Sequence, residues 1–250
     1  MLSIRNLSVT FQTPEGEPLP ALGPVSIQMT PGEFVCLVGP SGCGKSTMIK
    51  VIAGLQPATS GGVFLNDVPI VKPSPKIGLM FQDATLMPWR TVRDNIGLPL
   101  ELAGVERIQR DNIVDGMLDM LGLTEFASTY PVGLSGGMAQ RVALGRVLSQ
   151  RPDVLLLDEP FGALDALTRE QVSFDLLRAW RRDHQTILMV THDITEAVVM
   201  ADRVLVMGRR PGQIIEDITV SMRRPRHPED AFSTDFGEIA RSVRAAINRA

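Results

Sequence analysis

The fold is decided by the stretch Gly39-Pro40-Ser41-Gly42-Cys43-Gly44-Lys45-Ser46, which satisfies the pattern G-x-x-x-x-G-K-[ST]. The apolar run before it, EFVCLV at 33–38, predicts a buried strand, and TMIKVIAG after it predicts a helix from near Gly44 to Gly54. A glycine-rich turn between a strand and a helix points backbone N–H groups inward, at the positive end of the helix. The stretch therefore predicts a phosphate-binding loop in an α/β fold.

Two side chains at the end of this loop have expected roles in nucleotide binding. Lys45 is expected to reach the β- and γ-phosphates, and the Ser46 hydroxyl is expected to bind Mg²⁺. Thr47 is expected to support a phosphate one residue further along. A glycine-rich turn with a solvated lysine is the alternative, but it leaves the flanking strand and helix unexplained. The predicted nucleotide-binding residues are Gly39, Pro40, Ser41, Gly42, Cys43, Gly44, Lys45, Ser46 and Thr47.

A second apolar strand, VLLLD at 154–158, ends in two adjacent carboxylates, Asp158 and Glu159. An aspartate at such a strand end holds Mg²⁺ in phosphate-loop NTPases, so Asp158 is the predicted metal ligand. Glu159 is then expected to orient or deprotonate the attacking water. An exposed acidic pair is common on its own, but it is unexpected after an apolar strand in a chain with this loop.

The remaining pattern predicts an α/β fold: a phosphate-loop NTPase core with a mainly parallel sheet, an N-terminal antiparallel β part and a helical insertion. Strands are predicted at 3–11, 25–29, 186–191 and 203–207. Helical periodicity without a convincing strand predicts the insertion at about 88–150. The expected domains are 1–220 and a C-terminal extension, 221–250, in which a Pro/Arg-rich linker precedes a helix.

The composition of the chain limits which partners it can bind and in which cellular compartment it is expected. The chain has 250 residues, a net charge of −3 and 44% hydrophobic residues, enough for a packed core. The chain has no net positive charge that would attract nucleic acid, so no nucleic-acid partner is expected. The two cysteines form no paired framework, which fits a reducing compartment. The sequence shows no signal peptide and no stretch of about 20 apolar residues. We therefore expect a cytoplasmic protein that reaches a membrane only through a partner.

A third motif carries a family resemblance. The segment Leu134-Ser135-Gly136-Gly137-Met138 precedes the helical AQRVALGRVL and resembles the LSGGQ signature of ABC-transporter ATPases. Gln82 after LMF, the Gly162-Ala163-Leu164-Asp165 segment and His192 after a strand follow in the order of that family. The resemblance covers about residues 1–220 and implies a subunit that binds and hydrolyses ATP.

The resemblance also implies roles for single residues. Phe11 is implied to stack on adenine, although an ordinary core phenylalanine in a strand is the alternative. Gln82 is implied to sense the γ-phosphate and the metal, and to communicate with a membrane partner. His192 is implied to contact the γ-phosphate, and Asp165 to organise the opposite site of a dimer. The expected catalytic residues are therefore Lys45, Gln82, Glu159 and His192, and the expected metal ligands are Ser46, Gln82 and Asp158.

The signature segment predicts that the ATP site needs a second subunit. A Gly-Gly pair that opens a helix makes another anion-binding helix start, with the Ser135 hydroxyl and the Gly137 N–H as donors. In the family this second site, with Ser135, Gly136 and Gly137, closes on ATP held by a partner copy in a head-to-tail dimer, expected here to be a homodimer. Met138 stands where the signature usually has Gln; because Ser135 and Gly137 are intact, catalysis is expected to survive, and the departure bears on the strength of dimer closure.

The stretches MPWRTVRDNI and VMGRRPGQI resemble the ATPase subunits of nitrate, sulfonate and taurine importers. They imply transmembrane permease subunits, a solute-binding protein that acts indirectly, and a place on the cytoplasmic face of the cell membrane. Leu86, Met87, Pro88 and Trp89 are candidates for a groove that takes a short permease helix. The alternative is that they fill the core of the insertion.

Three other functions compete with a small-anion importer. An importer ATPase for another small solute is one alternative, because in this type of importer specificity resides in a separate binding protein and in the membrane subunits. A soluble ABC-type ATPase uncoupled from transport usually carries a coiled coil or a second cassette, and neither is present. A kinase or GTPase has no use for the LSGGM segment, and the guanine motif N-K-x-D is absent.

Overall fold

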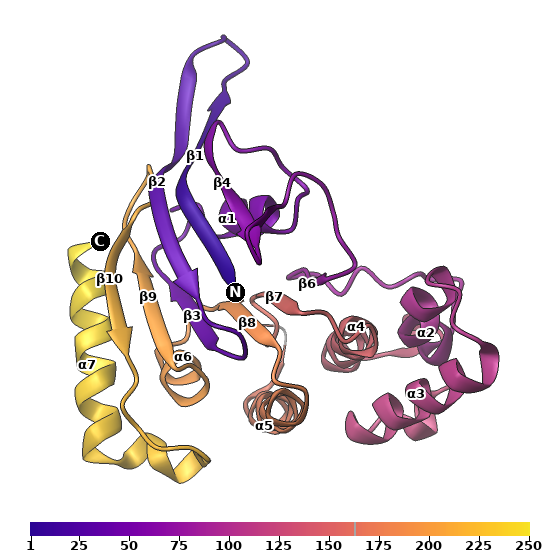
Figure 1. Ribbon diagram of the computed structural model, residues 1–250. Helices are drawn as coiled ribbons and strands as arrows, with labels where there is room; N and C mark the ends of the chain where they lie inside the picture. Colours follow the sequence, from indigo (N-terminus) through magenta and orange to yellow (C-terminus); the bar gives the residue numbers. More distant parts are fainter. Residues whose placement is uncertain (163) are drawn as a thin grey trace. The chain divides into compact units, whose positions relative to one another are not determined.

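The computed structural model describes residues 1–162 and 164–250. These residues form two compact units (Figure 1): unit 1 comprises 1–77 and 186–250, and unit 2 comprises 78–185. Ala163, in the segment that resembles a family motif, lies outside the described residues. The predicted boundary at residue 220 stays a prediction.

Unit 1 begins with an antiparallel sheet in the strand order β2-β1-β4-β5. Its strands are β1 (Leu2–Gln12), β2 (Pro18–Met29), β4 (Ser60–Leu65) and β5 (Val68–Pro69). The sequence predicted β2 only from residue 25. The strand starts earlier because the far end of β1 pairs with it, Phe11 opposite Leu19 and Gln12 opposite Pro18.

The second sheet of unit 1 has the order β10-β9-β3-β8. Its strands are β3 (Phe34–Val38), β8 (Thr186–Val190), β9 (Arg203–Met207) and β10 (Ile214–Thr219). β3 runs parallel to β8 and β9, whereas β10 is antiparallel to β9. Every residue of β3 and β8 is buried, as their continuous apolar runs predict. The sequence analysis missed β10, because this edge strand is mostly exposed and carries no run of buried apolar residues.

Three α-helices accompany these sheets: α1 (Lys45–Ile52), α6 (Ile194–Met200) and α7 (Thr234–Arg249). α7 buries Phe236, Val243 and Ala246 and packs against α6, β9 and β10, beside which it lies in Figure 1. A 3₁₀ turn, Pro228–Phe232, precedes it and also contacts α6. The C-terminal segment is therefore packed onto unit 1.

Unit 2 is mainly helical. β6 (Ile77–Met80) lies beside β7 (Val154–Asp158) in the sheet. Along the chain, these two strands are separated by three helices: α2 (Val92–Leu102), α3 (Arg107–Met120) and α4 (Gly136–Ser149). Two 3₁₀ turns, Thr124–Phe126 and Pro131–Gly133, link α3 to α4, and α5 (Ala166–Asp183) follows β7. α2 packs on both α3 and α4. No strand lies between residues 81 and 153, all of which are described, so the predicted helical insertion is confirmed.

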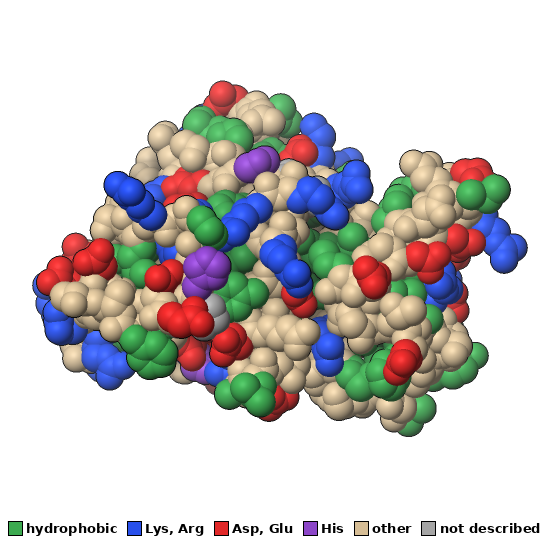
Figure 2. Space-filling model, turned by 90° about the horizontal axis from the view of Figure 1, so that it is seen from below, with side chains coloured by type: hydrophobic (Ala, Val, Ile, Leu, Met, Phe, Trp, Pro, Cys, Tyr) green, Lys and Arg blue, Asp and Glu red, His purple; other side chains and the backbone are tan. Residues whose placement is uncertain are grey.

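The charged side chains lie mostly on the surface, while the core of both units is apolar. On the face in Figure 2, lysines and arginines are interspersed with aspartates and glutamates. A mixed α/β fold with one antiparallel sheet and a mostly parallel one is what the sequence predicted, so the fold class is confirmed.

Candidate nucleotide-binding site

The phosphate loop follows β3 and leads directly into α1, as the sequence predicted. Gly44, the residue before α1, has a φ of 113°, a left-handed conformation that favours glycine. A Cβ at this position would lie 2.6 Å from Leu22 Cδ2 and 2.9 Å from the Ala21 carbonyl oxygen. Glycine is therefore required here both by the backbone angle and by the space, and it gives the loop its tight curl.

Lys45 is held inside this curl. Its side chain is only 8% exposed, and its Nζ donates to the carbonyl oxygens of Gly39 at 2.8 Å and Pro40 at 2.9 Å. Ser46 is exposed at the next position, and no side chain among the described residues caps the start of α1. A helix start without a side-chain cap leaves backbone donors for an anion. The loop thus combines a held ammonium group with a helix N-terminus.

His192 lies on the same edge of the sheet as the phosphate loop. β3 and β8 are parallel neighbours, and the loop follows the end of β3 while His192 follows the end of β8. The Thr191 backbone N–H donates to the Leu37 carbonyl at 3.3 Å, which ties the two strand ends together. Parallel strands present such sites at their carboxyl ends. Unit 1 therefore brings Lys45 and His192 to one edge.

Phe11 lies near the end of β1 and is 38% exposed. Its cross-strand neighbour Leu19 is 37% exposed, so the two side chains form a small apolar surface. A partly exposed ring is available for stacking on a base, which a fully buried core phenylalanine is not.

In unit 2, Gln82 and Glu159 are neighbours. Gln82 Nε2 donates to Glu159 Oε2 at 3.4 Å, and Glu159 follows Asp158, the last residue of β7. Asp158 is 9% exposed, and Glu159 has a φ of 48°, a left-handed backbone that a non-glycine residue adopts only at some energetic expense. The structure thus joins two residues that the sequence analysis chose from separate motifs.

Gln140 was missed by the sequence analysis. This buried side chain lies on α4 and donates from Nε2 to the backbone carbonyl of Gln82. It connects the helix of the signature segment with the segment that carries Gln82. The only sequence signal was a glutamine within a mostly apolar helical run, which is weak.

The signature segment forms the start of α4. Ser135 is the N-cap residue, and its Oγ accepts from the Met138 backbone N–H at 3.2 Å. Ser135 and Gly136 are exposed, and a Cβ built on Gly136 would meet nothing within 4 Å. A Cβ on Gly137 would lie 3.0 Å from Leu164 Cδ2. Packing within the chain therefore restricts residue 137 to a small side chain, whereas it leaves room for a larger one at 136.

Asp165 caps α5 in the same manner. Its Oδ1 accepts from the Thr168 backbone N–H at 3.0 Å, and the hydrogen bonds with Thr168 lower the pKa of the Asp165 carboxyl. Asp165 is exposed, as are the first residues of α5, with Leu167 at 82%. This helix start therefore presents a charged and an apolar side chain to its surroundings.

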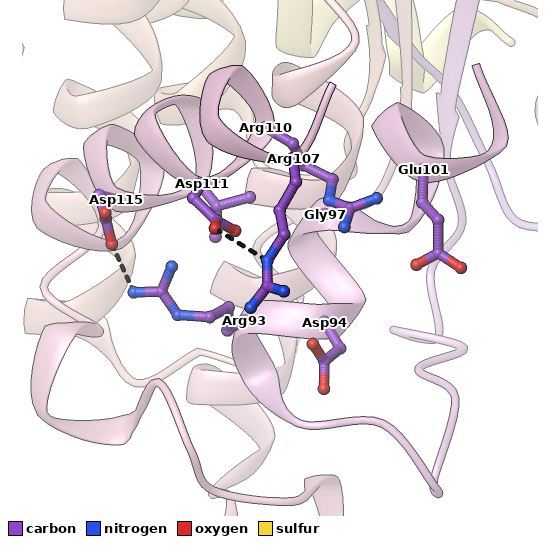
Figure 3. A pocket seen from close by; sticks show the side chains of 9 residues that line it. Arg93, Asp94, Gly97, Glu101, Arg107, Arg110, Asp111 and Asp115 are labelled. Carbon is purple, nitrogen blue, oxygen red and sulfur yellow. Dashed lines mark hydrogen bonds and ion pairs between the residues drawn. The ribbon is translucent and has the colours of Figure 1, made fainter. Parts of the chain in front are cut away.

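A charged pocket of about 430 Å³ opens between α2 and α3 (Figure 3). Arg93 is ion-paired with Asp115, and Arg107 Nε lies 3.7 Å from Asp111 Oδ2. The residues that line it are Arg93, Asp94, Gly97, Glu101, Arg107, Arg110, Asp111, Val114 and Asp115.

The loop before α2 is organised by the fully buried Asn95. Its Oδ1 accepts from the Met87 N–H at 2.8 Å, and its Nδ2 donates to the carbonyls of Arg90 and Thr91 at 3.0 Å each. Trp89, in the middle of this loop, is 72% exposed. Pro88 is also exposed, while Leu86 and Met87 are half-buried. Of the four candidate residues for a permease groove, Pro88 and Trp89 are therefore not part of the core of the insertion.

Across the described residues, no helix combines the length and the apolar character needed to cross a bilayer.

Comparison with known proteins identifies the family. The sequence pattern of the ABC transporter family matches residues 22–162. The nitrate import ATP-binding protein NrtD of Synechococcus elongatus is 46% identical over 223 residues, which cover 88% of this chain and 81% of that protein. The taurine import ATP-binding protein TauB of Roseobacter denitrificans is 43% identical over 213 residues, with 85% and 80% covered.

A solved structure agrees with these relatives. The dimeric structure of a post-hydrolysis state of the ATP-binding cassette MJ0796, bound to ADP and Pi, matches with a TM-score of 0.81 and 32% identity. It covers 89% of this chain, and all of that chain is matched. The phosphate loop, the acidic strand end and the signature helix start occur together in one chain, and each of these matches covers 85% or more of it. This chain belongs to the ABC transporter family and is one of its ATP-binding, ATP-hydrolysing members.

Proposed function

We propose that this chain energises an importer of small anions, of the nitrate, sulfonate and taurine kind, and that two copies bind ATP between them head to tail. The observation that carries the two-copy arrangement is the start of α4. Glycine is a poor helix former, and the chain's own packing does not require it at position 136. An exposed glycine at a helix start suits the close approach of something outside the chain, and an anion is the natural occupant of a helix N-terminus.

Within each site, we assign the binding of the ATP phosphates to the loop and Lys45. The ammonium group of Lys45 is already held in the loop by two carbonyls, so little reorganisation is needed before it meets phosphate oxygens. Phe11 supports the adenine by stacking. Ser135, Gly136 and Gly137 of the partner copy supply the second set of donors.

Glu159 is the proposed general base, which orients or deprotonates the attacking water. Its hydrogen bond with Gln82 gives the carboxylate a fixed orientation, since the Gln82 backbone is itself held by Gln140. His192 is proposed to contact the γ-phosphate, and Asp165 to contact the opposite site of the dimer. These roles need only the positioning of the reacting groups and the stabilisation of charge on the phosphates, which are the main contributions of a protein to phosphoryl transfer.

Mg²⁺ is the proposed metal, and the donors offered to it are oxygens. Ser46 contributes a hydroxyl, Asp158 a carboxylate and Gln82 an amide carbonyl, which is the hard-oxygen set that Mg²⁺ prefers. When bound, the ion neutralises charge on the β- and γ-phosphates. Substituting Asp158 is therefore expected to raise the Mg²⁺ concentration needed for hydrolysis.

The permease partner is proposed to dock on unit 2, at the surface formed by Trp89 and the pocket between α2 and α3. Trp89 supplies an exposed aromatic anchor, and Asn95 fixes the loop that presents it. Arg90, the residue after Trp89, is ion-paired with Glu101 of the pocket, so charged groups lie near this anchor, as in the polar rim of an interface. The subunit then lies on the cytoplasmic face of the cell membrane, and a solute-binding protein acts through the permease.

The composite site is tested by mixing two inactive variants. Lys45→Ala disables a subunit's own phosphate loop, and Ser135→Arg blocks the donors that it offers to its partner. Each variant alone is expected to be inactive, whereas an equal mixture forms some dimers with one intact site and recovers about a quarter of wild-type phosphate release. A mixture as inactive as its components would contradict sites shared between copies.

The transport role is tested with a transporter reconstituted in vesicles from this chain, its permease subunits and its solute-binding protein. Nitrate, taurine or an alkanesulfonate is expected to stimulate hydrolysis, and Trp89→Ala is expected to reduce that stimulation. Phe232→Ala is the matched control, since Phe232 is 91% exposed in the C-terminal segment. Stimulation by none of the three solutes would favour an importer for another solute. A chain that binds no permease would favour a soluble ATPase.

A further inference from the structure

Arg226, in the segment expected to be a linker, is one of the largest fully buried side chains of the protein. It is 2% exposed, and its guanidinium group is surrounded by backbone carbonyls. Its Nη1 donates to Val198 O at 3.1 Å and Val199 O at 3.2 Å, and also to Ala201 O. On the other side, Nη2 donates to Val220 O at 3.2 Å and Met222 O at 3.1 Å.

The first three acceptors lie at the C-terminal end of α6. The last carbonyls of a helix have no partner within the helix, and a cation there also interacts favourably with the helix dipole. Burial lowers the pKa of Arg226 to about 10, which still leaves the group charged at neutral pH. The side chain therefore acts as a charged cap on α6 that is supplied from the C-terminal extension.

Arg224 makes a second attachment beside it. Its Nη2 donates to Met200 O at 2.6 Å, and its Nε donates to Asp202 Oδ1 at 2.8 Å. The other oxygen of Asp202 accepts from the backbone N–H of Phe34 at 2.9 Å, at the start of β3. The extension is thus linked to α6 and to the strand that leads into the phosphate loop.

The opposite end of α6 carries the His192 segment. Asp193 caps the helix by accepting from Thr195 N at 2.7 Å, and Thr191 Oγ1 donates to Glu196 Oε2 at 2.6 Å. α6 has seven residues and is about 10 Å long. Because the helix is so short and is held at both ends, a shift of its C-terminal end is transmitted to His192.

We propose that Arg226, assisted by Arg224, is a positioning residue that holds α6 and thereby fixes His192 for hydrolysis, with the C-terminal extension acting as a latch. This inference rests on the proposed role of His192. Packing alone does not require a buried charge here, since α7 already contributes an apolar face, and buried charges are often replaceable by apolar groups at no loss of stability. A guanidinium group that binds carbonyls in several directions fixes an orientation, which an apolar contact does not.

The test compares Arg226→Lys and Arg226→Met in the full-length chain, with Arg223→Lys as the matched control because Arg223 is exposed in the same segment. Amide hydrogen exchange is measured for residues 191–200 and for α1, and steady-state kinetics give kcat and KM for ATP. In both Arg226 variants, exchange is expected to rise in 191–200 and to stay unchanged in α1. In Arg226→Lys, kcat is expected to fall about tenfold with KM within about twofold.

A double-mutant cycle then asks whether the effect passes through His192. In a His192→Ala background, Arg226→Lys is expected to change kcat by less than about twofold, because the residue it positions has been removed. An equal loss in both backgrounds, or wild-type exchange in 191–200 in both Arg226 variants, would overturn the latch. If wild-type protein fails to hydrolyse ATP, the proposed function fails, and the exchange measurement still decides whether Arg226 holds the His192 segment.

Discussion

The starts of α1 and α4 are both glycine-rich helix starts suited to phosphate, yet they are built differently. The loop before α1 curls through Gly44 with a left-handed backbone and holds the ammonium group of Lys45 against its own carbonyls. The start of α4 is capped by Ser135, its Gly136 is exposed, and no lysine or arginine occurs between residues 131 and 140.

The start of α1 is a phosphate site that is built within one chain, whereas the start of α4 is proposed to bind ATP held by a partner copy. At α1, substitution of the glycine is blocked by the chain itself, through Leu22 and Ala21. At α4, the chain leaves space beside Gly136, so the reason for glycine has to lie outside the chain. The predictions below use this contrast.

The largest effect is expected for Lys45→Ala. Removing the ammonium group from the phosphate loop is expected to weaken ATP binding and to lower phosphate release by on the order of a thousandfold, because a preorganised cation is lost. Lys50→Ala is the control, since Lys50 is an exposed lysine in the last turn of the same helix. Similar losses in both variants would show that Lys45 has no special place in the loop.

A pair of glycine substitutions is expected to have opposite effects on stability. Gly44→Ala is expected to lower the free energy of unfolding by roughly 2–4 kcal/mol, because of its φ and the two close contacts. Gly136→Ala is expected to raise it by up to about 1 kcal/mol and still to reduce ATP hydrolysis about tenfold or more. Denaturant unfolding and phosphate release measure the two quantities. Full activity in Gly136→Ala would contradict a partner's ATP at this position.

The N-cap serines of α4 and α7 form a third, smaller comparison. Ser135 and Ser233 each accept from a backbone N–H at 3.2 Å, so either Ser→Ala substitution is expected to cost about 1 kcal/mol of stability. Hydrolysis at saturating ATP is expected to fall about tenfold in Ser135→Ala and to stay unchanged in Ser233→Ala. If the two variants lose equal activity, Ser135 serves only as a helix cap.

The smallest effect is expected at Met138. Met138→Gln restores the residue usual in the signature and is expected to strengthen ATP-dependent dimerisation by about threefold, the value of one modest hydrogen bond. Sedimentation of the variant with ATP measures the change, with Met120→Gln as control for a half-buried methionine on α3. Weaker dimerisation in Met138→Gln would show that methionine suits this interface.

Much of the fold was predictable because its signals are local. The strands that end at Val38 and Asp158 are continuous apolar runs, and both motifs begin where those strands end. The phosphate loop combines glycine, lysine and a helix start within eight residues, so its geometry depends little on distant parts of the chain. The roles of Gln82 and His192 came from the resemblance alone and stay predictions.

Besides the edge strand β10, the features that were missed are buried polar side chains that bind backbone groups. Arg226 belongs to a Pro/Arg-rich segment that is typical of an exposed linker, and it is buried because α6 ends in carbonyls that need a donor. Asn95 and Gln140 likewise satisfy backbone groups of folded loops. Sequence periodicity reports apolar burial, so it gives no warning of a buried polar side chain.

The central claim, that ATP is held between two copies, is tested most directly by light-scattering mass of the Glu159→Gln variant. This variant is expected to bind ATP without hydrolysing it, so its mass should rise from 27.3 kDa to twice that value when ATP is added. Adding Ser135→Arg to the same chain should return the mass to 27.3 kDa with ATP present. A Glu159→Gln protein that loses hydrolysis, binds ATP and stays at 27.3 kDa would contradict the account.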